Sequence, residues 1–188
     1  MRIGDSVKIA VFASGNGSNF QTLAEQFPDQ VKFVFSDHHD AYVLERAERL
    51  GVAKASLELK EFSSKVDYEK ALVEILKDQE IDLILLAGYM KIIGATMLSK
   101  YKGKIINVHP SYLPDFAGSP HAIEESHEAK KGLGISIHYV DEGVDTGELI
   151  AQIPLAYHED LEVYERSVHE AEHKLYPEVV RQIILHQQ

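Results

Sequence analysis

Short apolar runs alternate with amphipathic stretches through the first 109 residues of the chain. The apolar runs are almost continuous, as strands buried on both faces are, and they cover residues 7–13, 31–36, 52–57, 81–87 and 105–108. The stretches between them have apolar residues at helical spacing, at 20–26, 42–50, 63–79 and 95–100. Alternating strands and helices are typical of α/β proteins, so we predict a doubly wound, mainly parallel sheet.

The pattern changes after residue 109. A helix is predicted over 120–130, and two strands over 134–140 and 148–155 are expected to pair antiparallel around a turn at 141–147. From Asp160 onward the chain reads as one long helix, which Pro177 should kink or divide because proline lacks the N–H group. No linker or repeat interrupts the chain, so we predict one domain over 1–188 with lobes at about 1–103 and about 104–188.

Charge and cysteine content narrow the function classes. The formal net charge is −11, from 30 acidic and 19 basic residues, which argues against nucleic-acid binding through clustered Lys and Arg. The chain has no cysteine, so it has no disulfides or thiolate metal sites, and this fits a reducing cytoplasm. No stretch reaches the length of a membrane span, and the first residues lack a signal-peptide core. We expect a cytoplasmic protein that binds no membrane.

Asn107 and His109 stand two residues apart at the end of the last parallel strand, so both should point to the same face. Pro110 ends that strand, because proline cannot donate to a sheet ladder. Ligands of open α/β sheets bind at this edge. An amide donor beside an imidazole can stabilise an oxyanion and move a proton. The alternative is a strand end with incidental polar residues.

A glycine-rich turn, Ser-Gly-Asn-Gly-Ser-Asn at 14–19, joins the first strand to the first helix. Glycines let the backbone approach a ligand closely, and the N–H groups and dipole of the helix start favour an anion, so we predict a phosphate site. The alternative is a loop whose Ser18 or Asn19 only caps the helix. Residues 88–94 follow the fourth strand and are small and apolar, with backbone groups to offer a flat ring.

Two histidine-containing segments match metal-site patterns. Residues 169–173, His-Glu-Ala-Glu-His, fit the HExxH zinc signature on a predicted helix, but the chain offers no identifiable third ligand and the helix has an apolar face of its own. Residues 37–40, Asp-His-His-Asp, form a turn in which adjacent side chains seldom converge on one ion. We interpret the first as an amphipathic helix and the second as a solvated loop.

Five motifs together resemble the phosphoribosylglycinamide formyltransferase family: residues 14–19, 86–90 (Leu-Ala-Gly-Tyr-Met), 107–114 (Asn-Val-His-Pro-Ser-Tyr-Leu-Pro), 136–140 (Ser-Ile-His-Tyr-Val) and 145–150 (Asp-Thr-Gly-Glu-Leu-Ile). The resemblance is collinear from about residue 7 to 180. It implies a Rossmann-like formyltransferase fold, with a nucleotide-binding lobe followed by a catalytic and folate lobe. It also implies transfer of a formyl group from 10-formyltetrahydrofolate to the amine of glycinamide ribonucleotide, in purine biosynthesis.

The resemblance implies that Asn107, His109 and Asp145 are catalytic. Asn107 would stabilise the oxyanion, His109 would stabilise the same charge or shuttle a proton to the leaving nitrogen, and Asp145 would accept the amine proton through water. It assigns phosphate and ribose binding to Gly15, Asn16, Gly17, Ser18, Asn19 and Glu172. It assigns folate binding to Lys65, Met90, Lys91, Ile92, Ile93, Val140, Asp141, Val144 and Asp145.

The expected partners are the ribonucleotide and 10-formyltetrahydrofolate, without a metal, and a weak homodimer is left open. Related families with the Asn-x-His-Pro-Ser core are methionyl-tRNA formyltransferase, which lacks this 14–19 loop, and formyltetrahydrofolate deformylase, which would use water as acceptor. A non-catalytic nucleotide or folate binder and a zinc hydrolase using His169 and His173 are further alternatives. Family members often carry a histidine close behind the loop glycine; here the order is Gly118-Ser-Pro-His121, so His121 receives no role, and the role of His138 stays open.

Overall fold

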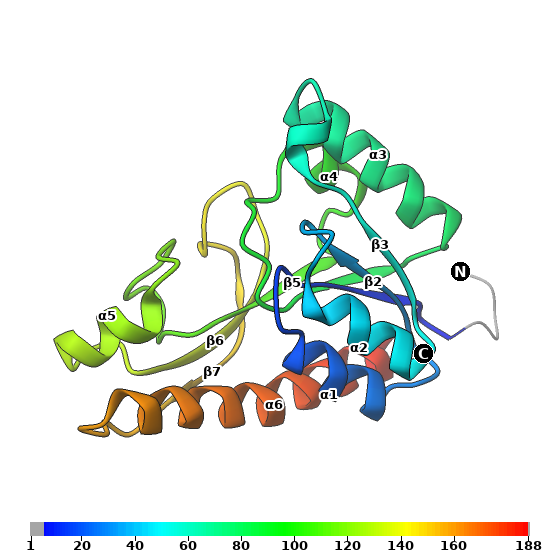
Figure 1. The fold of residues 1–188 in the computed structure, drawn as a ribbon. Coiled ribbons are helices and arrows are strands. Elements are labelled where there is room, and N and C mark those ends of the chain that lie inside the picture. The colour runs from blue at the N-terminus through cyan, green and yellow to red at the C-terminus, as the bar shows by residue number, and fades with distance from the viewer. Residues whose placement is uncertain (1–5, 188) are drawn as a thin grey trace.

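A seven-stranded sheet forms the centre of the computed structural model, which describes residues 6–187 (Figure 1). Its strands are β1 (Ile9–Phe12), β2 (Val31–Ser36), β3 (Ala53–Ser56), β4 (Leu83–Leu86), β5 (Ile105–His109), β6 (Gly134–Tyr139) and β7 (Leu149–Pro154). The strand order is β3-β2-β1-β4-β5-β6-β7, with β1 to β5 parallel and β6 and β7 antiparallel to their neighbours. The predicted doubly wound sheet and its antiparallel C-terminal strand pair are confirmed.

Helices cover both faces of this sheet (Figure 1). On one face lie α1 (Ser18–Gln26), α2 (Tyr42–Leu50) and the long α6 (Leu161–His186), and on the other lie α3 (Lys65–Asp78) and α4 (Ala95–Lys100). The short α5 (Ala122–Ala129) packs against the first half of α6. Successive residues of β1 alternate between the two layers: Val11 belongs to the core under α1, α2 and α6, whereas Phe12 belongs to the core under α3 and α4.

The register of the central strands brings distant motifs together. Asn107 on β5 is paired with Leu86 at the end of β4 and with His138 on β6. The strands β4 and β5 therefore pair directly across the boundary predicted between the two lobes. Because β5 is the last parallel strand and β6 runs the opposite way, residues of both strands reach the edge of the sheet where β1 and β4 end.

Most element ends differ from the predictions by one or two residues, as is usual for such boundaries. The helix over 42–50 is confirmed, and of the two candidate caps for α3 it is the Ser64 hydroxyl that accepts the Asp67 N–H, at 3.1 Å. A short 3₁₀ helix, η1 (Leu59–Glu61), was not predicted. No helix in the described range 6–187 is long and apolar enough to cross a membrane.

Pro177 does not divide the C-terminal helix, because α6 runs unbroken through it, so of the two predicted outcomes, a kink or a division, the division is wrong. Tertiary packing explains the continuity. Tyr176, next to the proline, is fully buried, and its hydroxyl donates to the carbonyls of Leu86 at 2.9 Å and Ile106 at 3.2 Å. Val179 and Val180 are also buried on the sheet, so these contacts hold the helix across the missing backbone hydrogen bond.

Candidate active site

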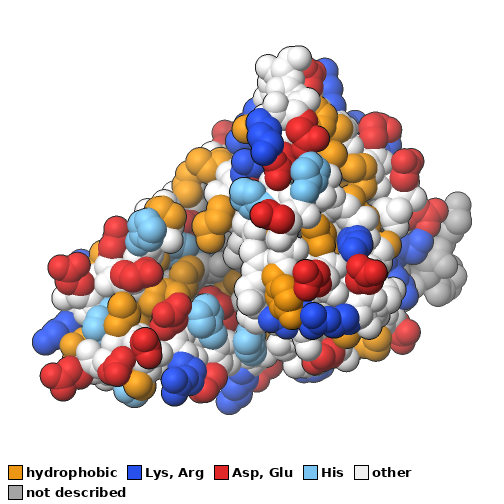
Figure 2. Space-filling view, viewed as in Figure 1, with side chains coloured by type: hydrophobic (Ala, Val, Ile, Leu, Met, Phe, Trp, Pro, Cys, Tyr) orange, Lys and Arg blue, Asp and Glu red, His pale blue; other side chains and the backbone are white. Residues whose placement is uncertain are grey.

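A cleft of about 930 Å³ opens where β1, β4 and β5 end, and Figure 2 shows the hollow with hydrophobic side chains along its edge. Its walls come from segments far apart in the sequence: residues 14–19, 86–93, 107–110, 118–120, 122–124, 138, 140–141 and 143–145, together with His38 and, on α6, His169 and Glu172. The volume and mixed lining are those of a small-molecule site. All five motifs singled out in the sequence therefore contribute residues to one cleft, which residues 118–120 and 122–124 and two side chains of α6 complete.

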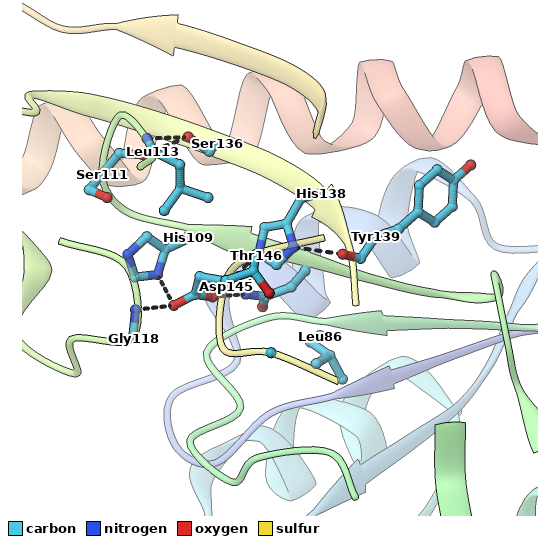
Figure 3. Close-up of polar contacts among 12 residues, drawn as sticks. Leu86, His109, Ser111, Leu113, Gly118, Ser136, His138, Tyr139, Asp145 and Thr146 are labelled. Atoms are coloured by element: carbon cyan, nitrogen blue, oxygen red, sulfur yellow. Dashed lines mark hydrogen bonds and ion pairs between the residues drawn. The ribbon is translucent and has the colours of Figure 1, made fainter. Parts of the chain in front are cut away.

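Asp145 lies at the centre of a buried polar cluster (Figure 3). Its Oδ2 is 3.3 Å from His109 Nδ1 and accepts the Gly118 N–H at 2.7 Å. Its Oδ1 is 3.3 Å from His138 Nε2 and accepts from Asn107 Nδ2, also at 3.3 Å. The structure thus joins the three predicted catalytic residues, and it adds His138, whose role the sequence left open.

The second nitrogen of each histidine determines where its protons are. His109 Nε2 is 3.0 Å from the Phe116 carbonyl. His138 Nδ1 is 2.8 Å from the Tyr139 carbonyl, as Figure 3 shows. A carbonyl only accepts, so these two nitrogens carry hydrogens. The nitrogens facing Asp145 are then bare in the neutral rings and gain a hydrogen when a ring becomes imidazolium. The cluster can therefore take up a proton at either imidazole, next to a carboxylate that stabilises it.

Burial and charge move the titrations in this cluster. Burial lowers the pKa of His109 below its usual 6.5, although the Asp145 charge and the Phe116 carbonyl oppose that shift. For Asp145, burial acts to raise the pKa, but the His138 hydrogen bond, the His109 charge and the Gly118 N–H together lower it below its usual 3.8. The free site at neutral pH therefore holds an ionised carboxylate beside a neutral His109.

The loop after β5 is anchored by the buried Ser136 hydroxyl (Figure 3). This hydroxyl accepts the Leu113 N–H at 3.0 Å and donates to the Ser111 carbonyl at 2.7 Å. Gln152 of β7 donates to the Leu113 carbonyl at 2.8 Å. These bonds fix the start of the segment that presents the Phe116 carbonyl to His109 and the Gly118 N–H to Asp145.

The glycine-rich loop at 14–19 forms another part of the cleft wall. Helix α1 begins at Ser18 with Gly17 as its N-cap in the left-handed conformation, φ 80°, and no side chain caps it. The alternative in which Ser18 or Asn19 caps the helix is therefore wrong, and the first-turn N–H groups are left for a ligand. A Cβ on Gly17 would lie 2.4 Å from a Val43 methyl, so this position fits only glycine.

The cleft thus combines an uncapped helix start with an oxyanion-type cluster. The chain that forms this cleft matches one known family over most of its length. The family model described as formyl transferase matches residues 7–180. The chain belongs to the formyl transferase family.

Several relatives of this formyl transferase are similar over nearly the whole chain. The phosphoribosylglycinamide formyltransferase of Bacillus subtilis (strain 168) is 43% identical over 184 residues, 94% of each chain. The solved phosphoribosylglycinamide formyltransferase from Streptococcus pneumoniae TIGR4 is 58% identical, with a TM-score of 0.89, over 94% of this chain and 98% of that one. Glycinamide ribonucleotide transformylase 1 from Geobacillus kaustophilus is 42% identical, with a TM-score of 0.90, over 95% and 99%.

The residues predicted to bind folate in this formyl transferase, with one exception, line the cleft: Met90, Lys91, Ile92, Ile93, Val140, Asp141, Val144 and Asp145. Met90 and Ile92 are 64% and 57% exposed, so they offer apolar surface at the rim. The exception is Lys65, the first residue of α3, which is exposed and does not line the cleft. The Met90 N–H donates to the Ser14 hydroxyl at 2.8 Å, which ties this wall to the glycine-rich loop.

The HExxH segment of α6 faces the glycine-rich loop, and its side chains bind separate partners. Glu172 is buried and accepts from Asn19 Nδ2 at 3.0 Å, so it reaches the cleft as predicted. His173 Nε2 is 3.2 Å from the Ser18 hydroxyl, whereas His169 lies within 3.6 Å of Glu165 and Glu172. In the described part of the chain, no group of three metal-ligating side chains includes His169 or His173.

Sequence reasoning missed one cluster. The turn at 37–40 meets η1, where His39 lies between the Ser56 hydroxyl at 2.7 Å and Glu61 at 2.5 Å, and Glu58 lies near His38 and His39. His39 and Glu61 are exposed and Glu58 is half-buried, and these groups are already paired: Glu58 and Glu61 cap η1 reciprocally, and Lys60 pairs with Glu58 at 2.5 Å. The turn alone gives no sign of this cluster, because the cluster forms through contact with residues 58–61, and Glu58 lies 19 positions beyond His39.

Proposed function

We propose that this formyl transferase moves the formyl group of 10-formyltetrahydrofolate to the amine of N1-(5-phospho-D-ribosyl)glycinamide, in de novo purine biosynthesis. The observation that carries the proposal is the union, in one cleft, of an uncapped helix start with the Asn107, His109 and Asp145 cluster. Its relatives at 43% and 58% identity are named for that activity. An oxyanion cluster alone serves several reactions; the anion site beside it favours a phosphorylated acceptor.

The ribonucleotide phosphate is assigned to the glycine-rich loop. The backbone N–H groups at the start of α1 donate to its oxygens, and the helix dipole favours its charge. Glu172, buried at the edge of the loop and held by Asn19, accepts from the ribose hydroxyls. These contacts direct the acceptor amine along the cleft toward Asn107.

The formyl donor is assigned to the wall made by residues 86–93, 140–141 and 143–145. The cleft is large enough for a flat bicyclic ring, and the exposed Met90, Ile92 and Val144 side chains offer apolar contact at its rim. Lys91, the wall's cation, suits the donor's anionic tail. No metal is needed in this scheme, because positioned donors and two aligned substrates lower the barrier.

In the reaction the acceptor amine bonds to the formyl carbon while the bond from that carbon to N10 of the donor breaks. Asn107 Nδ2 donates to the oxyanion that develops on the formyl oxygen. Asp145, ionised at neutral pH, takes the proton of the attacking amine through water and passes it to the bare Nδ1 of the neutral His109, which delivers the same proton to the departing N10. His138 holds Asp145 from the far side, so the carboxylate faces two imidazoles that can carry the proton.

An absorbance assay of formyl-donor consumption tests this proposal, with and without the ribonucleotide. We expect turnover only when the ribonucleotide is present, and its collapse in Asn107→Ala. Turnover without the ribonucleotide would instead assign the chain to folate deformylation with water as acceptor. Absence of turnover in both mixtures, with donor binding retained, would leave a non-catalytic binder and would contradict the proposal.

A further inference from the structure

The anion site proposed at the glycine-rich loop lacks a cation among its own residues. Lys91 is the one Lys or Arg that lines the cleft within the described residues, and it lies on the folate wall, 3.8 Å from the buried Asp37. The whole chain carries a formal charge of −11. A phosphate monoester brings about two further negative charges at neutral pH, so a nearby fixed positive charge would matter here.

Arg46, on α2 behind the loop, supplies such a charge. Its Nε donates to the Asn16 carbonyl at 2.7 Å, and its Nη2 donates to Asn16 Oδ1 at 2.7 Å. Its Nη1 donates to Gln21 Oε1 on α1. The half-buried guanidinium also lies over the Tyr42 ring, 5.0 Å from its centre. One rigid fork therefore binds the loop and the helix that follows it.

This fork fixes the orientation of donors that face the ligand. A guanidinium only donates, so Asn16 must turn its oxygen toward Arg46, which leaves the Asn16 NH₂ group to donate elsewhere. The peptide after Asn16 is planar and trans, so a carbonyl held toward Arg46 points the Gly17 N–H in the opposite direction. The Val43 N–H donates to the Gly15 carbonyl at 2.9 Å and holds the same loop from α2.

We propose that Arg46 is a positioning residue for the phosphate of the acceptor. It fixes the Asn16 amide and the Gly17 N–H and places a permanent positive charge behind the loop. The inference rests on the proposed function, since it needs a phosphorylated acceptor in this cleft. It adds a residue outside the cleft lining to the determinants of acceptor binding.

Arg49 offers a matched control on the same helix. Its guanidinium also lies over the Tyr42 ring, at 5.4 Å, and it contacts the Tyr42 hydroxyl and Glu45. None of its hydrogen bonds or ion pairs within residues 6–187 involves the glycine-rich loop. Arg46→Met and Arg49→Met therefore remove the same charge from one helix, but only the first removes the fork.

The test measures kcat and KM with the ribonucleotide and with its dephosphorylated ribonucleoside, in wild type, Arg46→Met, Arg46→Lys and Arg49→Met. For the ribonucleotide, we expect KM to rise about 10- to 100-fold in Arg46→Met, as for loss of charge-assisted hydrogen bonds. Arg46→Lys, which keeps the charge without the fork, should lie between Arg46→Met and wild type. In Arg46→Met, three quantities should each change less than about twofold: the KM of the formyl donor, the kcat with the ribonucleotide, and kcat/KM for the ribonucleoside. These quantities do not depend on the phosphate site.

A loss of equal size for the ribonucleotide and the ribonucleoside would show a general packing role and overturn the inference, as would an unchanged ribonucleotide KM in Arg46→Met. Calorimetry with ribose 5-phosphate distinguishes a failure of the Arg46 inference from a failure of the proposed function. If wild type binds ribose 5-phosphate but formylates nothing, the proposed function fails, and weaker binding in Arg46→Met, but not in Arg49→Met, still supports the positioning role. If wild type does not bind ribose 5-phosphate, the phosphate site itself is refuted.

Discussion

The two walls of the cleft are built in different ways. The glycine-rich loop uses the backbone of six consecutive residues, held in shape by Gly17 and by the Arg46 fork. The Asp145 cluster uses side chains that arrive from β5, β6 and a loop 38 residues beyond Asn107. A wall made of backbone depends on conformation, whereas a wall made of side chains depends on which groups are present. We therefore expect damage to the first to weaken binding and damage to the second to slow the reaction.

The two walls also differ in how much of their residues is exposed to solvent. Gly15 and Asn16 are exposed, whereas His109 and His138 are only 5% and 2% exposed. An exposed anion site can admit a hydrated phosphate without a large change in its own ionisation. A buried cluster changes the pKa values of its members, which is the setting in which proton transfer is tuned.

The largest effect is expected from Asp145→Asn. The amide cannot take the amine proton, and it presents an NH₂ group where the carboxylate faced two imidazoles, so kcat should fall about 10²- to 10⁴-fold. The KM of the ribonucleotide should change little. Steady-state kinetics measure both, with Glu142→Gln as control, since Glu142 is exposed on the same loop and does not line the cleft. A fall in affinity alone, at unchanged kcat, would contradict the division between the walls.

Gly17→Ala should act on binding. The added methyl meets Val43 at 2.4 Å and the residue keeps φ near 80°, so the loop must shift, and the ribonucleotide KM should rise about 10- to 100-fold. Gly103→Ala is the control: Gly103 also has positive φ, at 70°, but with open space around it. It should lower the free energy of unfolding by about 1 kcal/mol and leave KM unchanged. A Gly17→Ala enzyme with normal KM would show that the loop does not hold the phosphate.

The decrease of kcat/KM on the acid side of its pH profile should follow the protonation of His109. Because burial lowers its pKa below 6.5, the ring is neutral and can accept a proton at neutral pH, and kcat/KM should fall about tenfold per pH unit below that pKa. Asp145, with a pKa below 3.8, stays ionised over this range. In His109→Gln the residual activity should lose this limb. A wild-type limb centred above pH 6.5 would contradict the assignment.

The smallest effect is expected at the rim of the folate wall. Met90→Ala removes apolar surface that the donor would cover, so the donor KM should rise about 3- to 10-fold. The KM of the ribonucleotide and kcat should stay unchanged. Leu185→Ala, at an exposed apolar position near the end of α6, is the control. An equal rise in the ribonucleotide KM would mean that the two substrates do not occupy separate walls.

Much of the fold could be predicted because its signals are local. Buried parallel strands read as continuous apolar runs, and α2 ends at Gly51, whose left-handed conformation follows from its residue type. The predicted division of the C-terminal helix at Pro177 does not occur, because the local cost of a proline in a helix is outweighed by the burial of Tyr176, Val179 and Val180 against a distant sheet. The missing signal was tertiary.

In the candidate site, too, some parts have a local sequence signal and others have none. The glycine-rich loop was recognisable from six consecutive residues, although its side-chain cap was predicted as an alternative and the structure has none. The link from Asp145 to Asn107 came only from resemblance to a family, because no local pattern joins residues 38 positions apart. His138 and Arg46 carried no local signal, since one depends on the β5 and β6 register and the other on the packing of α2 against the loop.

One measurement tests the central claim most directly: the fate of the formyl carbon. The donor is prepared with ¹³C in its formyl group and incubated with the enzyme and the ribonucleotide, and products are followed by NMR. The account predicts that the label moves into the amide of the formylated ribonucleotide in proportion to the tetrahydrofolate formed, because the amine attacks the formyl carbon directly. Labelled formate in that proportion, with the ribonucleotide unchanged, would contradict it and make water the acceptor.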